Sequence, residues 1–122
     1  MRIRISWASG EVFGVLEDTP TGLRVCDALP VQSEANTWGQ EVYFEVPVRA
    51  ALEPDARQVV EPGTICFWVQ GSSLALPFGP TPVSRGNECR LVTAVNVLGR
   101  LEGDPGVLGS VRDGEPIRVE RA

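Results

Sequence analysis

The feature that most constrains the fold of this chain is an alternation of apolar and polar side chains, repeated in several short segments. It is cleanest over residues 41–48, where every second residue from Val42 onward is apolar. Successive side chains of a β-strand point to opposite faces, so this pattern is typical of a strand with one buried face. We expect Glu41, Tyr43 and Glu45 to face outward, beside solvent.

The same alternation predicts three hairpins and two further strands. The 17 Val, 13 Gly and 10 Pro residues fit short strands separated by turns. The expected strands cover residues 2–7, 11–17, 31–38, 41–48, 64–70, 74–78, 94–101 and 115–121. This favours a mainly β fold, a closed eight-stranded barrel with one or two short helices, because closure leaves no exposed edge strand. Its interior should hold Ile3, Ile5, Val42, Phe44, Val46, Ile65 and Phe67.

One segment predicts a well-defined helix. Thr19 is a suitable N-cap, and Pro20 follows at the first helical position, where its missing N–H costs nothing. We expect the helix to run to Leu29 and to bury an apolar stripe that includes Leu23 and Cys26.

Three other segments do not fit the strand pattern. Residues 49–62 mix Pro with charged side chains and are expected to cross the surface without regular structure. Residues 78–82 contain two prolines and form a rigid loop, since proline cannot donate to a β-ladder. Residues 104–111 are expected to form a single helical turn.

Composition excludes several classes of site. The chain has neither His nor Lys, and its 11 Arg are outnumbered by 16 carboxylates, for a net charge of −5. Without His there is no Ser-His or Cys-His nucleophile pair and no His-based zinc site. Cys26, Cys66 and Cys89 are scattered, which argues against a disulfide framework or a thiolate zinc site. We expect free, mostly buried thiols, no metal and no cofactor.

Charge and hydropathy also limit the partners. An acidic chain is poorly suited to a nucleic-acid backbone or an acidic membrane surface, where binding relies on clustered cations. No apolar run approaches the roughly 20 residues of a membrane span, and the first residues do not have the pattern of a secretory signal. We expect one cytoplasmic domain over residues 1–122, with no nucleic-acid or membrane partner. The sequence indicates no oligomeric state.

A binding site is expected on the outer face of the barrel, because the chain's own side chains fill the interior of a small eight-stranded barrel. Aromatic residues supply rigid contact area there, and Arg is a good donor to carboxylates and amides. The alternative is that the helix or the crossing segment covers these aromatics, which are then structural. The candidate ligand-binding residues are Trp38, Glu41, Tyr43, Trp68, Phe78, Thr81 and Arg90.

Several stretches, taken in order, are similar to the small prokaryotic cyclophilin-like proteins: Trp38-Gly39-Gln40-Glu41-Val42-Tyr43-Phe44-Glu45, Phe78-Gly79-Pro80-Thr81-Pro82 and Val95-Asn96-Val97-Leu98-Gly99. The resemblance implies an eight-stranded barrel of cyclophilin topology with shorter connections. Cyclophilins are prolyl isomerases that use an Arg to hydrogen-bond the twisting imide nitrogen and an apolar pocket of Phe, Met, Trp and His. This chain has no His and only an initiating Met, and the Arg and Phe-Met-x-Gln motifs are absent, so no catalytic residue carries over.

Three functions remain open on the sequence. The first is a cyclophilin-like barrel that binds a small molecule or peptide segment, with weak or no isomerase activity. The second is a peptidyl-prolyl isomerase with a rearranged site. The third is a non-catalytic accessory subunit of a complex. A saturable thermal shift, turnover of a proline peptide and co-purification of a partner distinguish them.

Overall fold

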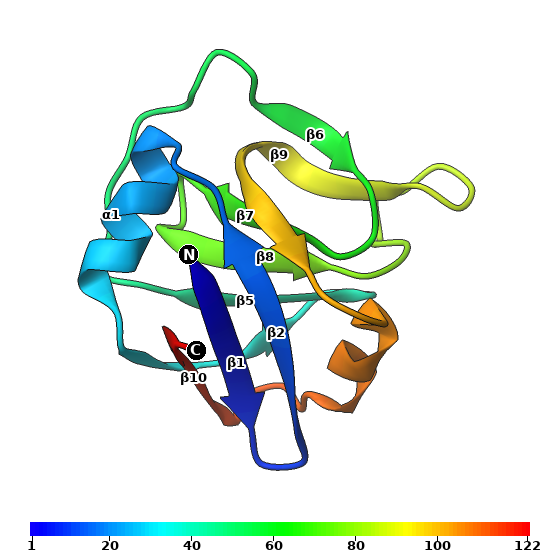
Figure 1. Cartoon of the computed structure of the whole chain (residues 1–122). Helices are drawn as coiled ribbons and strands as arrows, with labels where there is room; N and C mark the ends of the chain where they lie inside the picture. The colour runs from blue at the N-terminus through cyan, green and yellow to red at the C-terminus, as the bar shows by residue number, and fades with distance from the viewer.

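Ten strands form one sheet, nine of which curl into a barrel, and two short helices pack against it (Figure 1). The computed structural model describes residues 1–122. Strands account for 47% of the residues and helices for 12%, which confirms the mainly β prediction. The helices are α1 (Pro20–Ala28) and the 3₁₀ helix η1 (Pro105–Ser110). The strands are β1 (Arg2–Trp7), β2 (Gly10–Leu16), β3 (Val31–Glu34), β4 (Asn36–Thr37), β5 (Glu41–Glu45), β6 (Arg57–Val60), β7 (Thr64–Trp68), β8 (Ser73–Pro77), β9 (Cys89–Leu101) and β10 (Pro116–Arg121).

Nine of these strands follow one another around a nearly closed barrel, in the order β3-β10-β1-β2-β9-β7-β8-β5-β4. The two ends of this path are consecutive in the chain, because only Ala35 separates β3 from β4. Counted as one bent strand, they give the predicted eight. The seam lies between β3 and β5, where the Ser33 hydroxyl donates a hydrogen bond of 2.7 Å to the Glu45 carbonyl.

The three predicted hairpins are present as β1–β2, β4–β5 and β7–β8, all antiparallel. The predicted strand over 31–38 breaks at Ala35, which is fully buried. There the backbone turns from β10 to β5, and the Ala35 N–H donates to the Glu115 carbonyl at 2.8 Å.

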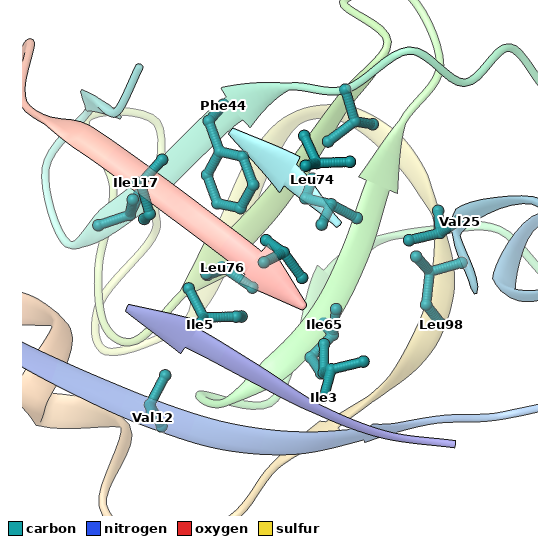
Figure 2. Close-up of a cluster of buried hydrophobic side chains, with 14 of the residues drawn as sticks. Ile3, Ile5, Val12, Val25, Phe44, Ile65, Leu74, Leu76, Leu98 and Ile117 are labelled. Atoms are coloured by element: carbon teal, nitrogen blue, oxygen red, sulfur yellow. The ribbon is translucent and has the colours of Figure 1, made fainter. Parts of the chain in front are cut away.

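The barrel interior is filled by apolar side chains from every wall. All seven residues predicted to lie inside are buried, and Phe44 and Phe67 are completely covered. Figure 2 shows Ile5 of β1, Phe44 of β5 and Ile117 of β10 converging with Leu74 and Leu76 of β8. A ligand must therefore bind outside this core.

A second, smaller apolar cluster lies on the outer face of the same sheet. It consists of Val60, Cys66, Ala75, Cys89, Leu91 and Val95. This cluster is covered by β6 and the first part of β9, which pair with each other. Figure 1 shows these two segments crossing the outside of the barrel. The expectation of an irregular crossing over residues 49–62 is therefore wrong for residues 57–60.

β9 also begins five residues earlier than the predicted start at residue 94. Its first part pairs with β6, its middle with β7 and its last residues with β2, and the register shifts along both of the first two ladders. When a strand changes partners and both of its faces are partly covered, its apolar and polar residues do not alternate regularly. Its first residues were missed for that reason.

The helix α1 begins as predicted. The Thr19 hydroxyl accepts a hydrogen bond from the Gly22 N–H at 2.9 Å, and Pro20 occupies the first turn. The predicted buried stripe is wrong at Leu23, which is 49% exposed, because Val25 and Thr21 face the barrel instead. The Thr21 hydroxyl joins the Glu53 carboxylate and the Asn96 amide, and these polar contacts set the rotation of the helix.

Candidate functional site

The register of the sheet places three of the predicted site residues on its outer face. Tyr43 lies opposite Ala75. Glu41, on the same side of β5 as Tyr43, lies opposite Pro77, and Trp68 lies opposite Ser73. Because alternate residues of each strand share a face, these side chains project away from the filled barrel.

A pocket of about 230 Å³ opens on this face. Its lining is mostly apolar and is formed by Trp38, Glu41, Tyr43, Trp68, Ala75, Leu91, Val92 and Val95. Four of the seven predicted site residues thus meet in one place. The expectation that Glu41 and Tyr43 face open solvent is wrong, because the start of β9 forms one wall of the pocket. Tyr43 is half-buried and Glu41 is buried.

Two rings form a fixed corner of the pocket. The ring centroids of Tyr43 and Trp68 are 5.9 Å apart, and their planes are inclined at 85°. Such edge-to-face pairs are favourable because the positive edge of one ring meets the negative face of the other. The Trp68 indole also donates a hydrogen bond of 3.2 Å to the Thr93 hydroxyl. Its orientation is therefore set before any ligand arrives.

The turn that carries Trp38 is held by the proline-containing loop over residues 78–82. The Trp38 N–H donates to the Glu41 carbonyl at 3.0 Å, which closes the turn. The Gln40 N–H donates to the Pro80 carbonyl at 2.9 Å, and the Phe78 N–H donates to the Gln40 carbonyl at 2.8 Å. The two stretches that carry the resemblance are therefore packed together, and this contact positions Trp38 and Glu41.

Glu41 is the one ionisable carboxylate in the pocket lining, and only 6% of its surface is exposed. Burial raises the pKa of Glu41 to about 7, because the charged form loses hydration and no hydrogen bond or cation replaces it. Every completely buried side-chain oxygen or nitrogen in the protein has a partner. The Glu41 carboxylate accepts no hydrogen bond, so its oxygens keep contact with open space; Glu41 lines this pocket and also a hollow beside η1.

The other three predicted residues do not line this pocket. Phe78 borders a separate hollow beside η1. Thr81 is buried, and its hydroxyl donates to the Arg90 carbonyl. The Arg90 guanidinium pairs with the Glu88 carboxylate at 2.7 Å and thereby lowers the pKa of that carboxyl. A ligand contact by any of the three stays a prediction.

Four pocket residues were not among the candidates: Ala75, Leu91, Val92 and Val95. Three of them lie on the early part of β9, whose path over the outer face has no sequence signal. The exposed side chain of Val92 at the rim is 50% accessible. Ala75 could have been predicted. It pairs with Tyr43 in the register of β5 and β8, so the two side chains lie on the same outer face.

The chain has no group of three or more Cys, Asp or Glu side chains arranged to hold a metal ion. All three cysteines are free and buried, as expected. Burial raises the pKa of each of their thiols. Neither helix has the length and apolar character needed to cross a membrane.

The protein is a small, nearly closed β-barrel with an apolar pocket on its outer face. The Cyclophilin-like family model matches residues 1–120, and the chain belongs to this family. It is similar to a hypothetical protein from Archaeoglobus fulgidus whose structure was determined in solution. The two chains are 40% identical, with a TM-score of 0.85 over 100% of this chain and 95% of that one. No curated protein matches the chain.

Proposed function

We propose that this cyclophilin-like barrel binds a small molecule, or one side chain of a peptide segment, in the outer-face pocket. The observation that carries the proposal is an apolar hollow with fixed aromatic walls, lined also by the buried Glu41, whose carboxylate accepts no hydrogen bond. Mostly apolar pockets with a few converging polar groups are the usual form of ligand sites. Cytoplasmic location belongs to this proposal as well.

The size of the pocket limits what it holds. Clefts for drug-sized ligands measure about 300–1,000 Å³, and this pocket measures about 230 Å³. It suits a compact molecule or a single side chain.

The same lining supports weak or absent isomerase activity. No arginine is among the eight residues that form the pocket. A proline bound there would have no guanidinium to hydrogen-bond its imide nitrogen, which is the contribution that the resemblance to cyclophilins implies for catalysis.

A thermal-shift screen of metabolites and short proline-containing peptides tests the proposal. We expect a saturable rise in melting temperature with at least one compound, since a ligand that binds only the folded state stabilises it. Tyr43→Ala should abolish that rise. Val92→Trp should do the same by filling the pocket from its exposed rim, with little effect on the free protein. Leu23→Ala, an exposed apolar truncation on the helix, is the matched control and should leave the rise intact.

Two results would overturn the proposal. One is a ligand-induced shift that survives both pocket variants. The other is acceleration of isomerisation of a proline tetrapeptide well above background and lost in Arg90→Ala, which would make the protein a genuine isomerase.

A further inference from the structure

The outer-face pocket combines two features that select one kind of ligand. The first is the aromatic lining, with Trp38 from the turn before β5, Tyr43 from β5 itself and Trp68 from the end of β7. The faces of aromatic rings carry negative electrostatic potential, and they attract cations within about 6 Å of the ring centroid. Tryptophan provides the strongest such face.

The arrangement of the rings matters as well. Tyr43 and Trp68 stand nearly perpendicular, with their centroids 5.9 Å apart, so they form two walls of a corner. Trp38 lies on the turn closed onto Glu41 and adds a third aromatic side chain to the lining. Perpendicular aromatic walls enclose a roughly spherical group from several sides, as in the sites that bind quaternary ammonium ions.

The second feature is the carboxylate of Glu41. Glu41 is buried, its carboxylate accepts no hydrogen bond from the protein, and no arginine lies beside it in the pocket. A negative charge in such a place is costly unless a positive charge joins it. No arginine of the chain forms an ion pair with the Glu41 carboxylate. A cation that neutralises this carboxylate must therefore come from outside the chain.

We propose that the pocket binds an organic ammonium cation, with the Glu41 carboxylate as counter-charge and the rings of Trp38, Tyr43 and Trp68 as its walls. This inference rests on the proposed function and names the class of ligand. The compact size of the pocket suits a methylated ammonium group. Such a group is carried by small molecules and by methylated lysine side chains.

Binding of a cation is coupled to the ionisation of Glu41. The titratable groups around it are the thiols of Cys66 on β7 and Cys89 on β9, and the phenol of Tyr43 on β5. Burial raises the pKa of both thiols, so they stay neutral between pH 6 and 8. Glu41 is therefore the group whose charge changes in this interval. A cation should bind the ionised form and weaken as the pH falls.

Titration calorimetry with two matched probes tests the inference. Choline carries a trimethylammonium group, and 3,3-dimethyl-1-butanol has the same shape without charge. At pH 8 we expect choline to bind at least tenfold more tightly than the alcohol. Between pH 8 and pH 6 the affinity for choline should fall about tenfold, because the ionised fraction of a carboxyl with a pKa of about 7 falls by that factor.

The variant pair Glu41→Gln and Glu45→Gln separates the pocket carboxylate from general surface charge. Both residues lie on the same face of β5, but Glu45 is exposed and outside the pocket lining. Glu41→Gln should lower the affinity for choline at least tenfold, leave that for the alcohol unchanged and remove the pH dependence. Glu45→Gln should change none of these.

A third probe, an N-acetylated trimethyl-lysine amide, distinguishes the source of the cation. Tighter binding of this probe than of choline would place the ammonium group on a peptide, and the reverse would indicate a small molecule; both support the cation class. Equal affinity for choline and the neutral alcohol would overturn the cation class and leave the pocket as a general ligand site. Failure of all three probes, while a neutral compound from the thermal-shift screen binds, would overturn it too.

Discussion

At the scale of single residues, Glu41 makes the stability of the fold depend on pH. Its pKa is about 7 in the folded protein, against an ordinary value of 4.5. Below pH 4.5 the carboxyl is protonated in both folded and unfolded chains and costs nothing. As the pH rises from 4.5 to 7, Glu41 ionises in the unfolded chain before it does so in the folded one, so the folded state loses stability. Above pH 7 this residue causes no further loss of stability.

Replacing this carboxyl therefore has an effect that grows with pH. We expect Glu41→Gln to be more stable than the wild type by up to about 3 kcal/mol at pH 8, and the difference to shrink toward pH 4. Urea unfolding at several pH values measures it. The control Glu45→Gln should show no such trend, and a difference for Glu41→Gln that stays flat with pH would contradict the burial of its carboxyl.

Neighbouring residues of β5 test which way that strand faces. Phe44 is completely buried in the barrel, whereas Glu45 is exposed. Phe44→Ala should cost about 3–5 kcal/mol of unfolding free energy through lost burial and an unfilled cavity. Glu45→Ala should stay within about 0.5 kcal/mol. A loss for Phe44→Ala as small as that for Glu45→Ala in denaturant melts would contradict this facing.

At the scale of elements, the turn before β5 and the loop over residues 78–82 depend on each other. Gly39 has a φ of +59°, and a Cβ there would lie 2.9 Å from Pro82 Cδ and 3.0 Å from the Pro80 carbonyl oxygen. A side chain would have to adopt a left-handed conformation and push the loop away. The glycine is thus required both by its backbone and by the close approach of the loop.

A pair of glycines separates these two requirements. Gly86 has a similar φ of +63°, but a Cβ would meet nothing within 4 Å. Gly86→Ala should cost only about 1–2 kcal/mol for the left-handed conformation. Gly39→Ala should cost about 1–3 kcal/mol more, because the loop must move. Equal costs in urea unfolding would show that the turn and the loop do not constrain each other.

Elements with one buried face could be predicted from the sequence. The hairpin β1–β2 shows clean alternation and a short turn, and Thr19 and Pro20 determine where α1 begins. The strand β6 and the first residues of β9 could not be predicted, because they lie over an already formed sheet and pair with each other across a register shift. The rotation of α1 escaped prediction as well, since hydrogen bonds of Thr21 determine it.

At the level of the whole molecule, the outer-face pocket exists because the second apolar cluster covers the outside of the sheet. The strands β5, β7 and β8 use their inner faces for the barrel core and their outer faces for the cluster under β6 and β9. Alternation predicted the position of Glu41, Tyr43 and Trp68 on this outer face. It could not predict their burial, because the wall formed by Leu91, Val92 and Val95 comes from the segment without a sequence signal.

The proposed function requires that a ligand binds on this outer face and not elsewhere on the barrel. The three tryptophans allow a direct test, because each indole N–H gives one resonance in a nitrogen–proton correlation spectrum. Trp38 and Trp68 line the pocket, whereas the Trp7 indole donates to the Ser110 hydroxyl at 2.9 Å and is absent from the lining.

The measurement is a titration of the ¹⁵N-labelled protein with a compound found in the thermal-shift screen, with the three signals assigned by single Trp→Phe variants. We expect the indole signals of Trp38 and Trp68 to move together and saturate at the same concentration, while that of Trp7 stays in place. Saturable movement of the Trp7 signal alone, or of none of the three while the melting temperature rises, would place the ligand elsewhere and rule out binding in the outer-face pocket.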